Sequence, residues 1–238
     1  SVLLRETLDA YAHGEVHVGA GGTTLRFATA YWATREGSSI TLGGTTELNQ
    51  RPIAPLVDAL NALGAEITYA NTRAEAPLHI KGHQLQGGSL HLGHVKSSQF
   101  VTALMLIAPT MRDGLRLEWD SVVSQPYLVM TAALLRSAGI PVTLTKYGVS
   151  IPHVEAVDPV QLVIERDWSA VAFWCEALAL SVAQDKSILD VFSHVGGFGL
   201  AAMANGAASV TCVDGSQPAL NLASRGAVAT RAETPFEA

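Results

Sequence analysis

The sequence predicts an α/β protein that is built from repeated units and followed by a second α/β segment of another kind. Two stretches share one order of elements when the second is laid over the first at an offset of about 75 residues. Hydrophobic residues make up 48% of the chain, which is enough to fill a core. After Gln184 the pattern changes to a Rossmann-like one. We therefore predict one domain over residues 1–183 and another over residues 184–238.

The first copy of the repeat begins at a Gly-rich turn over residues 19–22, which opens a helical pattern. A strand over 39–42 and a helix over 52–63 follow, and two short strands are expected near Ile67 and Leu78. Pro stands at the start of the second helix and Gly just past its end, where these residues are favoured. The order of elements is α-β-α-β-β.

The second copy repeats that order. Ser97 and Ser98 open its first helix. The remaining elements are a strand over 115–119, a helix over 126–137 and strands near Val142 and Val149. A helix that opens beside Gly, Ser or Thr can receive an anion, because its free N–H groups and its dipole both point outward. Ordinary N-capping by Thr23 and Ser97 is the alternative explanation.

Composition narrows the classes of function. The formal net charge is −6 and charged residues make up 15%, so nucleic acid is an unlikely partner. No apolar run is long enough to span a membrane and no leader pattern is visible, so we expect a cytoplasmic protein. Cys175 and Cys212 lie in apolar surroundings and are predicted to be reduced, buried thiols.

Five motifs, four in the two copies and one after them, carry a family resemblance, and their order and spacing make the signal specific. They are Gly19–Arg26, Gln50–Ile53, Ser97–Phe100, Ser124–Tyr127 and Glu165–Ser169. Together they resemble the loops and helix starts of EPSP synthase. The resemblance implies two globular domains of three βαβαββ units each, of which this chain holds about two units. It also implies transfer of the enolpyruvyl group of phosphoenolpyruvate to shikimate 3-phosphate, in the shikimate pathway of aromatic amino acid biosynthesis, without metal or organic cofactor.

The same resemblance implies roles for individual residues. Ser97, Ser98 and Ser124 are expected to hold the 3-phosphate of the shikimate, and hydroxyls suit this task because they donate to phosphate oxygens. Gln99 is expected to contact the hydroxyls of the ring. Tyr127 is expected to line the same site.

The phosphoenolpyruvate side of the site is expected around the first copy. Gly22 allows close approach of the backbone, and Arg51 is expected to pair with the anionic groups of the substrate. The alternative interpretation of Arg51 is a solvated side chain that only precedes a helix. Arg26 either contacts substrate or braces the loop, Thr23 either binds or caps, and Asp167 is either a site residue or an N-cap.

Two features of that family are not found. Its early Lys-Ser motif is absent, since the first lysine is Lys81, and the acid and base residues of its second domain do not follow. Because these groups supply charge stabilisation and proton transfer, we predict an incomplete catalyst, and whether the chain is an enzyme stays open.

From Lys186 the chain reads as strand, Gly-rich turn, helix and strand, ending in an acidic residue. This stretch resembles class I S-adenosylmethionine-dependent methyltransferases, particularly those that methylate ribosomal RNA cytosines. The resemblance makes S-adenosylmethionine the possible cofactor. His194 is expected on the loop surface. The cofactor-side residues implied are Asp190, Gly196, Gly197 and Asp214.

We interpret the chain as a junction of two incomplete genes, whether by fusion, assembly error or design. Three functions therefore remain: an EPSP-synthase-like fragment that binds shikimate 3-phosphate, a methyltransferase fragment, and a non-catalytic chimeric chain.

Overall fold

The computed structural model describes residues 2–8, 10, 13–71, 74–157, 160–161, 168–230 and 234–238. Contacts divide the chain into two compact units, Ser1–Leu162 and Val163–Ala238. Each unit is described by itself.

Unit 1 begins with helix α1 (Val2–Leu8) and then contains one complete βαβαββ copy. Its strands form a four-stranded sheet in the order β1-β2-β4-β3, in which β1 and β2 are parallel and the other pairs antiparallel. A short helix, α3 (Thr46–Asn49), precedes the second long helix. The main elements are β1 (His13–His17), α2 (Gly22–Thr34), β2 (Ser39–Gly43), α4 (Ala54–Ala62), β3 (Glu66–Tyr69) and β4 (Leu78–Lys81).

The second copy has the same topology, with strand order β5-β7-β10-β9 and one parallel pair, β5 with β7. Its main elements are β5 (Gly88–His91), α5 (Ser98–Ile107), β7 (Leu115–Glu118), α6 (Gln125–Ser137), β9 (Thr143–Leu144) and β10 (Gly148–Ile151). A 3-10 turn (Ala108–Thr110) extends α5, and two short strands, β6 (His94–Val95) and β8 (Ser121–Val122), pair separately. The repeat predicted from the sequence is therefore confirmed.

Sequence reasoning missed the strand that opens each copy. In β1 only Val16 is buried, and β5 (Gly-Ser-Leu-His) has one apolar side chain that is partly exposed. Both strands lie at the edge of their sheet. An edge strand that buries so little leaves no alternating pattern to detect.

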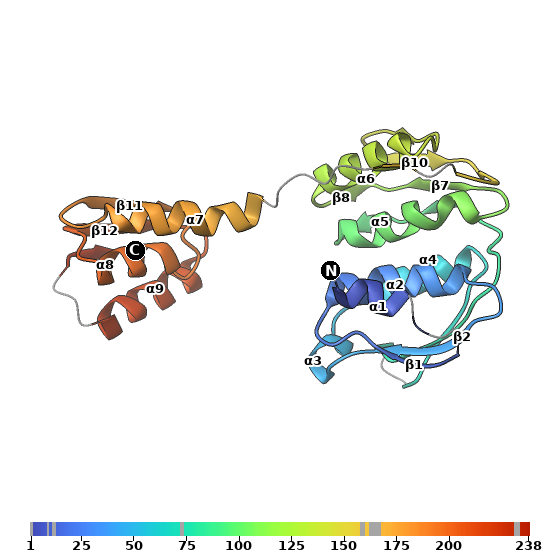
Figure 1. Cartoon of the computed structure of the whole chain (residues 1–238), viewed down its shortest axis with the longest axis horizontal. Helices are drawn as coiled ribbons and strands as arrows, with labels where there is room; N and C mark the ends of the chain where they lie inside the picture. Colours follow the sequence, from blue (N-terminus) through green and yellow to red (C-terminus); the bar gives the residue numbers. More distant parts are fainter. Residues whose placement is uncertain are drawn as a thin grey trace. The chain divides into compact units, whose positions relative to one another are not determined.

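One core joins the two copies. Helices α2, α4 and α5 lie between the two sheets (Figure 1), and buried side chains of both copies belong to the same cluster. The largest, Trp32 and Trp119, are 1% and 2% exposed. Because the helices of the two copies touch, their N-terminal ends can contribute to a common site.

Unit 2 is a parallel three-stranded sheet in the order β11-β12-β13, preceded by a helix. The elements are α7 (Trp168–Ser181), β11 (Ser187–Val191), α8 (Gly197–Ala204), β12 (Ser209–Val213), α9 (Gln217–Thr230) and β13 (Phe236–Glu237). Leu180, near the end of α7, packs against the core of this unit. Compact packing therefore divides the chain earlier than the boundary at 183 that we predict from the sequence.

The two cysteines differ. Cys212 is buried, as predicted, whereas Cys175 is exposed, which corrects the prediction. Cys175 lies on α7 beside Trp174, which is 77% exposed, so this part of the helix is uncovered. None of the helices in the described ranges has the length and apolar character that a bilayer crossing requires.

Candidate functional site

A pair of short parallel strands brings two helix starts together in the second copy. His94 pairs with Ser121, and the N–H of Val123 donates to the carbonyl of Val95 at 3.3 Å. The chain leaves β6 directly into α5 and leaves β8 directly into α6. Because parallel strands end at the same edge, the N-termini of α5 and α6 lie next to each other.

These helix starts line a cavity of about 540 Å³ together with the start of α2. Seven of the residues singled out in the sequence lie on its wall although they are far apart in the chain. They are Thr23, Arg26, Ser97, Ser98, Gln99, Ser124 and Tyr127. Asp167 lies outside the described residues.

Serine hydroxyls at this cavity do not serve the helices that they precede. Ser97 and Ser124 occupy the N-cap positions of α5 and α6, and neither side chain makes a capping hydrogen bond. Ser124 adopts a left-handed backbone conformation, with φ 56°, which is unfavourable for a residue with a Cβ. Capping therefore does not explain either residue, and both hydroxyls are available to a ligand.

Thr23 does not cap α2 either. The helix begins at Gly22, with Gly21 as its N-cap, so Thr23 lies inside the first turn. Its Oγ1 accepts a hydrogen bond of 3.1 Å from Nε2 of Gln99. The first turn of α2 is thus tied to the first turn of α5.

Arg26 adds a second link between the two copies. Its Nη1 donates to Oε1 of Gln99 at 2.9 Å, and its guanidinium lies 5.5 Å from the centre of the Phe100 ring. Burial, and then the like charge of Arg51, lowers the pKa of Arg26 below its ordinary value. Arg26 therefore braces α5 through Gln99 and Phe100, whereas one alternative from the sequence was that it braces the Gly-rich loop, and it also presents charge to the cavity.

Gly22 lies where two guanidinium groups approach the helix start. A Cβ atom at this position would stand 3.0 Å from Nη1 of Arg26 and 3.3 Å from Nη1 of Arg51. Arg51 is exposed and is not among the residues on the cavity wall. Gly22 and Arg51 therefore form a neighbouring, cationic part of the same region.

The cavity wall carries positive charge and no negative charge among the described residues. Its ionised groups are Arg26 and Lys96, and no Asp or Glu lines it. Such a wall favours an anion. Sequence reasoning missed Lys96, although a cation directly before the Ser-Ser pair is a visible signal.

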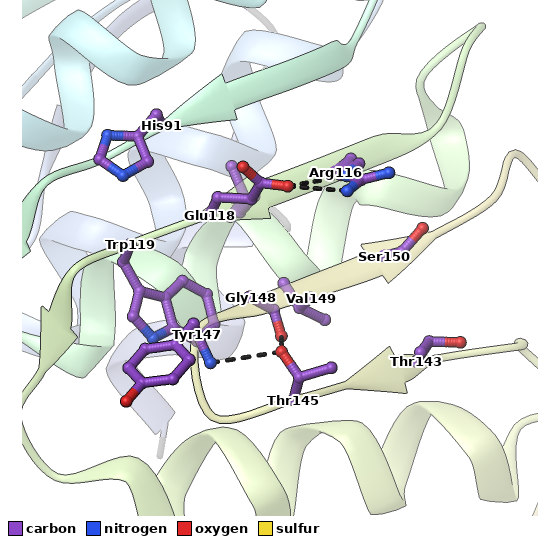
Figure 2. Close-up of a pocket in the computed structure, with 11 residues that line it drawn as sticks. His91, Arg116, Glu118, Trp119, Thr143, Thr145, Tyr147, Gly148, Val149 and Ser150 are labelled. Atoms are coloured by element: carbon purple, nitrogen blue, oxygen red, sulfur yellow. Dashed lines mark hydrogen bonds and ion pairs between the residues drawn. The ribbon is translucent and has the colours of Figure 1, made fainter.

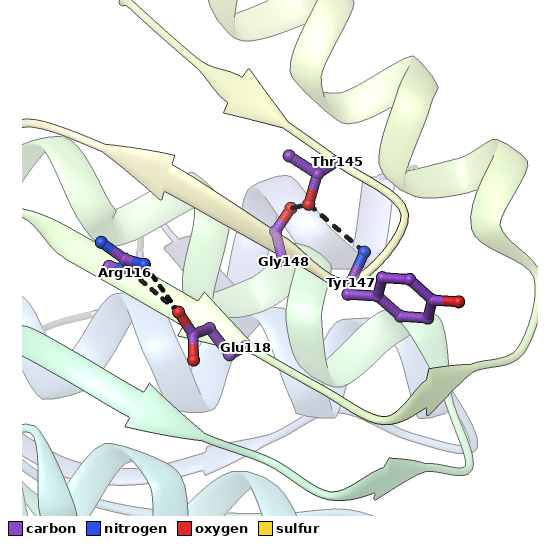
Figure 3. Close-up of polar contacts among 5 residues, drawn as sticks. All are labelled: Arg116, Glu118, Thr145, Tyr147 and Gly148. Carbon is purple, nitrogen blue, oxygen red and sulfur yellow. Dashed lines mark hydrogen bonds and ion pairs between the residues drawn. The ribbon is translucent and has the colours of Figure 1, made fainter.

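A second concavity, of about 430 Å³, lies on the outer face of the sheet β5-β7-β10-β9 and differs in its charge (Figure 2). Arg116 donates from Nε and Nη2 to the same carboxylate oxygen of Glu118, at 3.1 and 2.8 Å (Figure 3). The hydroxyl of Thr145 is held in the turn by Tyr147 and Gly148. Because the positive charge of Arg116 is already paired with the carboxylate of Glu118, this surface is a weaker candidate for an anion site.

In unit 2 the Gly-rich turn is held by two carboxylates. Asp190, which is 8% exposed, accepts from the N–H of Gly199 at 2.9 Å. Asp214, directly after β12, accepts from the N–H groups of His194 and Ser216 at 2.9 and 2.8 Å. These bonds, that from His194 first, lower the pKa of Asp214. Both carboxylates are among the residues that the resemblance places on the cofactor side.

The glycines of that turn have different physical roles. Gly196 has φ +77°, and a Cβ there would lie 2.8 Å from Cβ of Ala223. A Cβ at Gly197 would meet no atom within 4 Å. His194 is exposed, as predicted. In the described part of the chain no group of three or more His, Cys, Asp or Glu residues is arranged to hold a metal ion.

Comparison with known proteins places these features in a family. A sequence model described as EPSP synthase (3-phosphoshikimate 1-carboxyvinyltransferase) matches residues 4–188. The chain belongs to the EPSP synthase family. The match includes both βαβαββ copies and all of α7, and it ends in β11 of unit 2.

Relatives agree with this membership, and solved structures agree with the fold. A 3-phosphoshikimate 1-carboxyvinyltransferase of Bacteroides fragilis is 36% identical over 181 residues, which are 74% of this chain and 43% of that protein. Pentafunctional AROM polypeptide 2 of Lodderomyces elongisporus is 35% identical over 67% of this chain and 11% of its own length. The structure of an EPSP synthase from Acinetobacter baumannii superposes with a TM-score of 0.60 at 20% identity, covering 70% of this chain and 37% of the other. This chain thus spans less than half the length of these EPSP synthase relatives.

Proposed function

We propose that unit 1 binds shikimate 3-phosphate in the cavity at the starts of α2, α5 and α6. The observation that carries the proposal is the pair of N-cap serines whose hydroxyls make no capping bond, on a wall with cations and no acidic group. A phosphate monoester needs several hydrogen-bond donors and a positive field, and this wall offers both. The reaction that this site serves in the family is enolpyruvyl transfer from phosphoenolpyruvate.

We further propose that the phosphoenolpyruvate side lies at Gly22 and Arg51. Two guanidinium groups with like charge approach the same helix start there, and an anion between them relieves their repulsion. A guanidinium fork matches the geometry of a carboxylate or a phosphate. Gln99, which bonds both Arg26 and Thr23, supports this arrangement because it lies between the two proposed sites.

The chain by itself is expected to bind without turnover at an enzyme-like rate. Enolpyruvyl transfer requires proton transfer to and from the reacting groups, and the described wall of the cavity holds no carboxylate or imidazole. A positioned acid or base typically contributes about 10²–10⁴-fold to the rate. The described wall of this cavity thus offers binding elements of the transferase without an acid or base for the chemistry.

Calorimetric titration with shikimate 3-phosphate tests the binding step. Ser98→Ala and Ser124→Ala are each expected to weaken binding by about tenfold, the loss of one hydrogen bond to a charged group. Ser150→Ala, on the outer face of β10, is the matched control and should bind like the wild type. Absence of binding by the wild-type chain, or equal binding by all four proteins, overturns the proposal.

A phosphate-release assay with both substrates tests the chemistry. We expect no sustained release above background. Sustained turnover that disappears in Arg51→Ala shows instead that the chain contains every group the reaction needs.

For unit 2 we propose a partial S-adenosylmethionine site at the Gly-rich turn. The supporting observation is the Asp214 carboxylate, which follows a parallel strand and bonds the N–H of His194 in that turn. An acidic residue at this place in a nucleotide-binding unit accepts from ribose hydroxyls. Equilibrium dialysis with S-adenosylmethionine should show binding that is weakened in Asp214→Ala. Unchanged binding in that variant removes the assignment, and an absence of binding in the wild type leaves unit 2 as a non-catalytic part of a chimeric chain.

A further inference from the structure

Lys96 is the charged residue of the cavity wall whose side chain makes no polar contact with the other described residues. It stands between β6 and the N-cap of α5, directly before Ser97, and it is exposed. Among the described residues no hydrogen bond, ion pair or ring contact engages its side chain. It lines both the serine cavity and an adjoining cavity of about 750 Å³ between α4 and α5.

Arg26, the other cation on this wall, is already engaged. Its guanidinium bonds Gln99 and covers the ring of Phe100. A shift of Nη1 from Gln99 to a ligand would break this hydrogen bond between the two copies of the repeat. Lys96 can turn toward a ligand without losing any contact that the structure shows.

The serine side of the cavity otherwise offers neutral donors. A phosphate monoester carries about −1.5 to −2 charge at pH 7, because its second pKa is about 6. Hydroxyls and helix N-terminal N–H groups donate hydrogen bonds to it but supply only partial charge. A full positive charge beside these donors selects the dianion over the monoanion and over a neutral ligand.

We propose that Lys96 is a specificity-determining residue that supplies the positive charge for the phosphate of the bound ligand, next to Ser97, Ser98 and Ser124. This inference rests on the proposed shikimate 3-phosphate site and adds a residue that its serines do not include. The ammonium group acts as a point charge on a flexible stem, which suits a phosphate held by other donors. Lys96 thereby makes binding depend on the charge of the phosphate.

The test is calorimetric titration of the full chain with shikimate 3-phosphate and with shikimate, which lacks the phosphate. Lys96→Ala is expected to weaken binding of shikimate 3-phosphate about tenfold, the lower part of the range for hydrogen bonds to charged groups, because the side chain is exposed. Binding of shikimate should not change. Lys96→Arg should restore most of the loss, since it restores the charge.

Lys146→Ala is the matched control, because Lys146 is an exposed lysine of the same unit beside Tyr147 and away from this cavity. Binding of shikimate 3-phosphate should also weaken less with added salt in Lys96→Ala than in the wild type, because one screened charge is gone. An equal loss in Lys96→Ala and Lys146→Ala, an equal loss for shikimate, or no loss at all overturns the role of Lys96.

Ser124→Ala separates this inference from the proposed function. If Ser124→Ala weakens binding and Lys96→Ala does not, the serine site stands and the Lys96 proposal fails. If Lys96→Ala weakens binding and Ser124→Ala does not, Lys96 binds the phosphate but the serine site is wrong. If the wild-type chain binds no shikimate 3-phosphate, both are wrong.

Discussion

Ser97 and Ser124 occupy N-cap positions without capping, so their replacement by alanine should not destabilise unit 1. Replacing a Ser or Thr that does cap a helix by alanine lowers the free energy of unfolding by about 0.5–2 kcal/mol. Thr45 supplies the comparison within the same unit, because its hydroxyl accepts from the N–H of Leu48 at 3.3 Å. We expect a cost of about 1 kcal/mol for Thr45→Ala, and a change within about 0.5 kcal/mol for Ser97→Ala and Ser124→Ala.

Urea denaturation followed by tryptophan fluorescence measures these differences. Trp32 and Trp119 are buried in unit 1 and report its unfolding. Trp168 and Trp174 belong to unit 2 and are replaced by Phe in the common background, so that the signal comes from unit 1 alone. A cost of about 1 kcal/mol should also lower the thermal midpoint of a unit of this size by about 2–4 °C.

The reasoning is refuted if either serine variant loses as much free energy of unfolding as Thr45→Ala. In that case the hydroxyls contribute to the helices after all, and their availability to a ligand is no longer an argument for the site. If the serine variants keep full stability and lose binding of shikimate 3-phosphate, their role lies in the ligand.

Three further outcomes follow from the structure. Gly22→Ala should leave the thermal midpoint of unit 1 unchanged or higher, because alanine favours the helix. The same variant should weaken binding of phosphoenolpyruvate in titrations, because the added Cβ stands 3.0 Å from Nη1 of Arg26. Unchanged binding of phosphoenolpyruvate contradicts this prediction. Gly199→Ala should lower the free energy of unfolding of unit 2 by about 1–3 kcal/mol in denaturant titrations, because the added Cβ would lie 2.7 Å from Sγ of Cys212. Gly197→Ala should leave this free energy unchanged, because a Cβ there would meet no atom within 4 Å. The folded-state pKa of Asp214 is depressed, so its contribution to stability is present above its unfolded pKa of about 3.9 and is lost as pH falls through the folded pKa. In Asp214→Asn the free energy of unfolding of unit 2 should therefore fall less steeply with decreasing pH in this acid range. An unchanged pH dependence contradicts this prediction.

Much of the fold was predictable because the helices carry clear signals. Pro and Gly mark the ends of the second helix in each copy, and the observed ranges of α4 and α6 lie close to those predicted. The strands β1 and β5 were not predictable from their own residues, because they bury almost nothing and depend on pairing with β2 and β7. The cavity was predictable only through the family motifs, since the contact of β6 with β8 joins segments that local sequence does not connect.

The roles of Thr23, Ser97 and Lys96 also depend on contacts between segments that are distant in the sequence. Capping by Thr23 and Ser97 was a fair alternative from sequence, because hydroxyls at helix starts usually cap. What decides against it is the hydrogen-bond partner, which for Thr23 is Gln99 in the other copy. Lys96 is visible in the sequence directly before the Ser-Ser pair, but its meaning comes from the absence of acidic residues on the described cavity wall, which only the structure shows.

The repeat itself explains how the two proposed anion sites can share one small region. Each copy ends a parallel strand at a helix start, so each copy exposes helix N–H groups at the same edge of its sheet. In the first copy the helix start carries Gly22, which leaves room for two guanidinium groups, whereas in the second copy Ser98 stands at the equivalent helix start. One fold unit used twice therefore yields a cationic half and a hydroxyl-rich half. Gln99 belongs to the hydroxyl-rich half and bonds Arg26 and Thr23 of the cationic half, so a single side chain links the two halves.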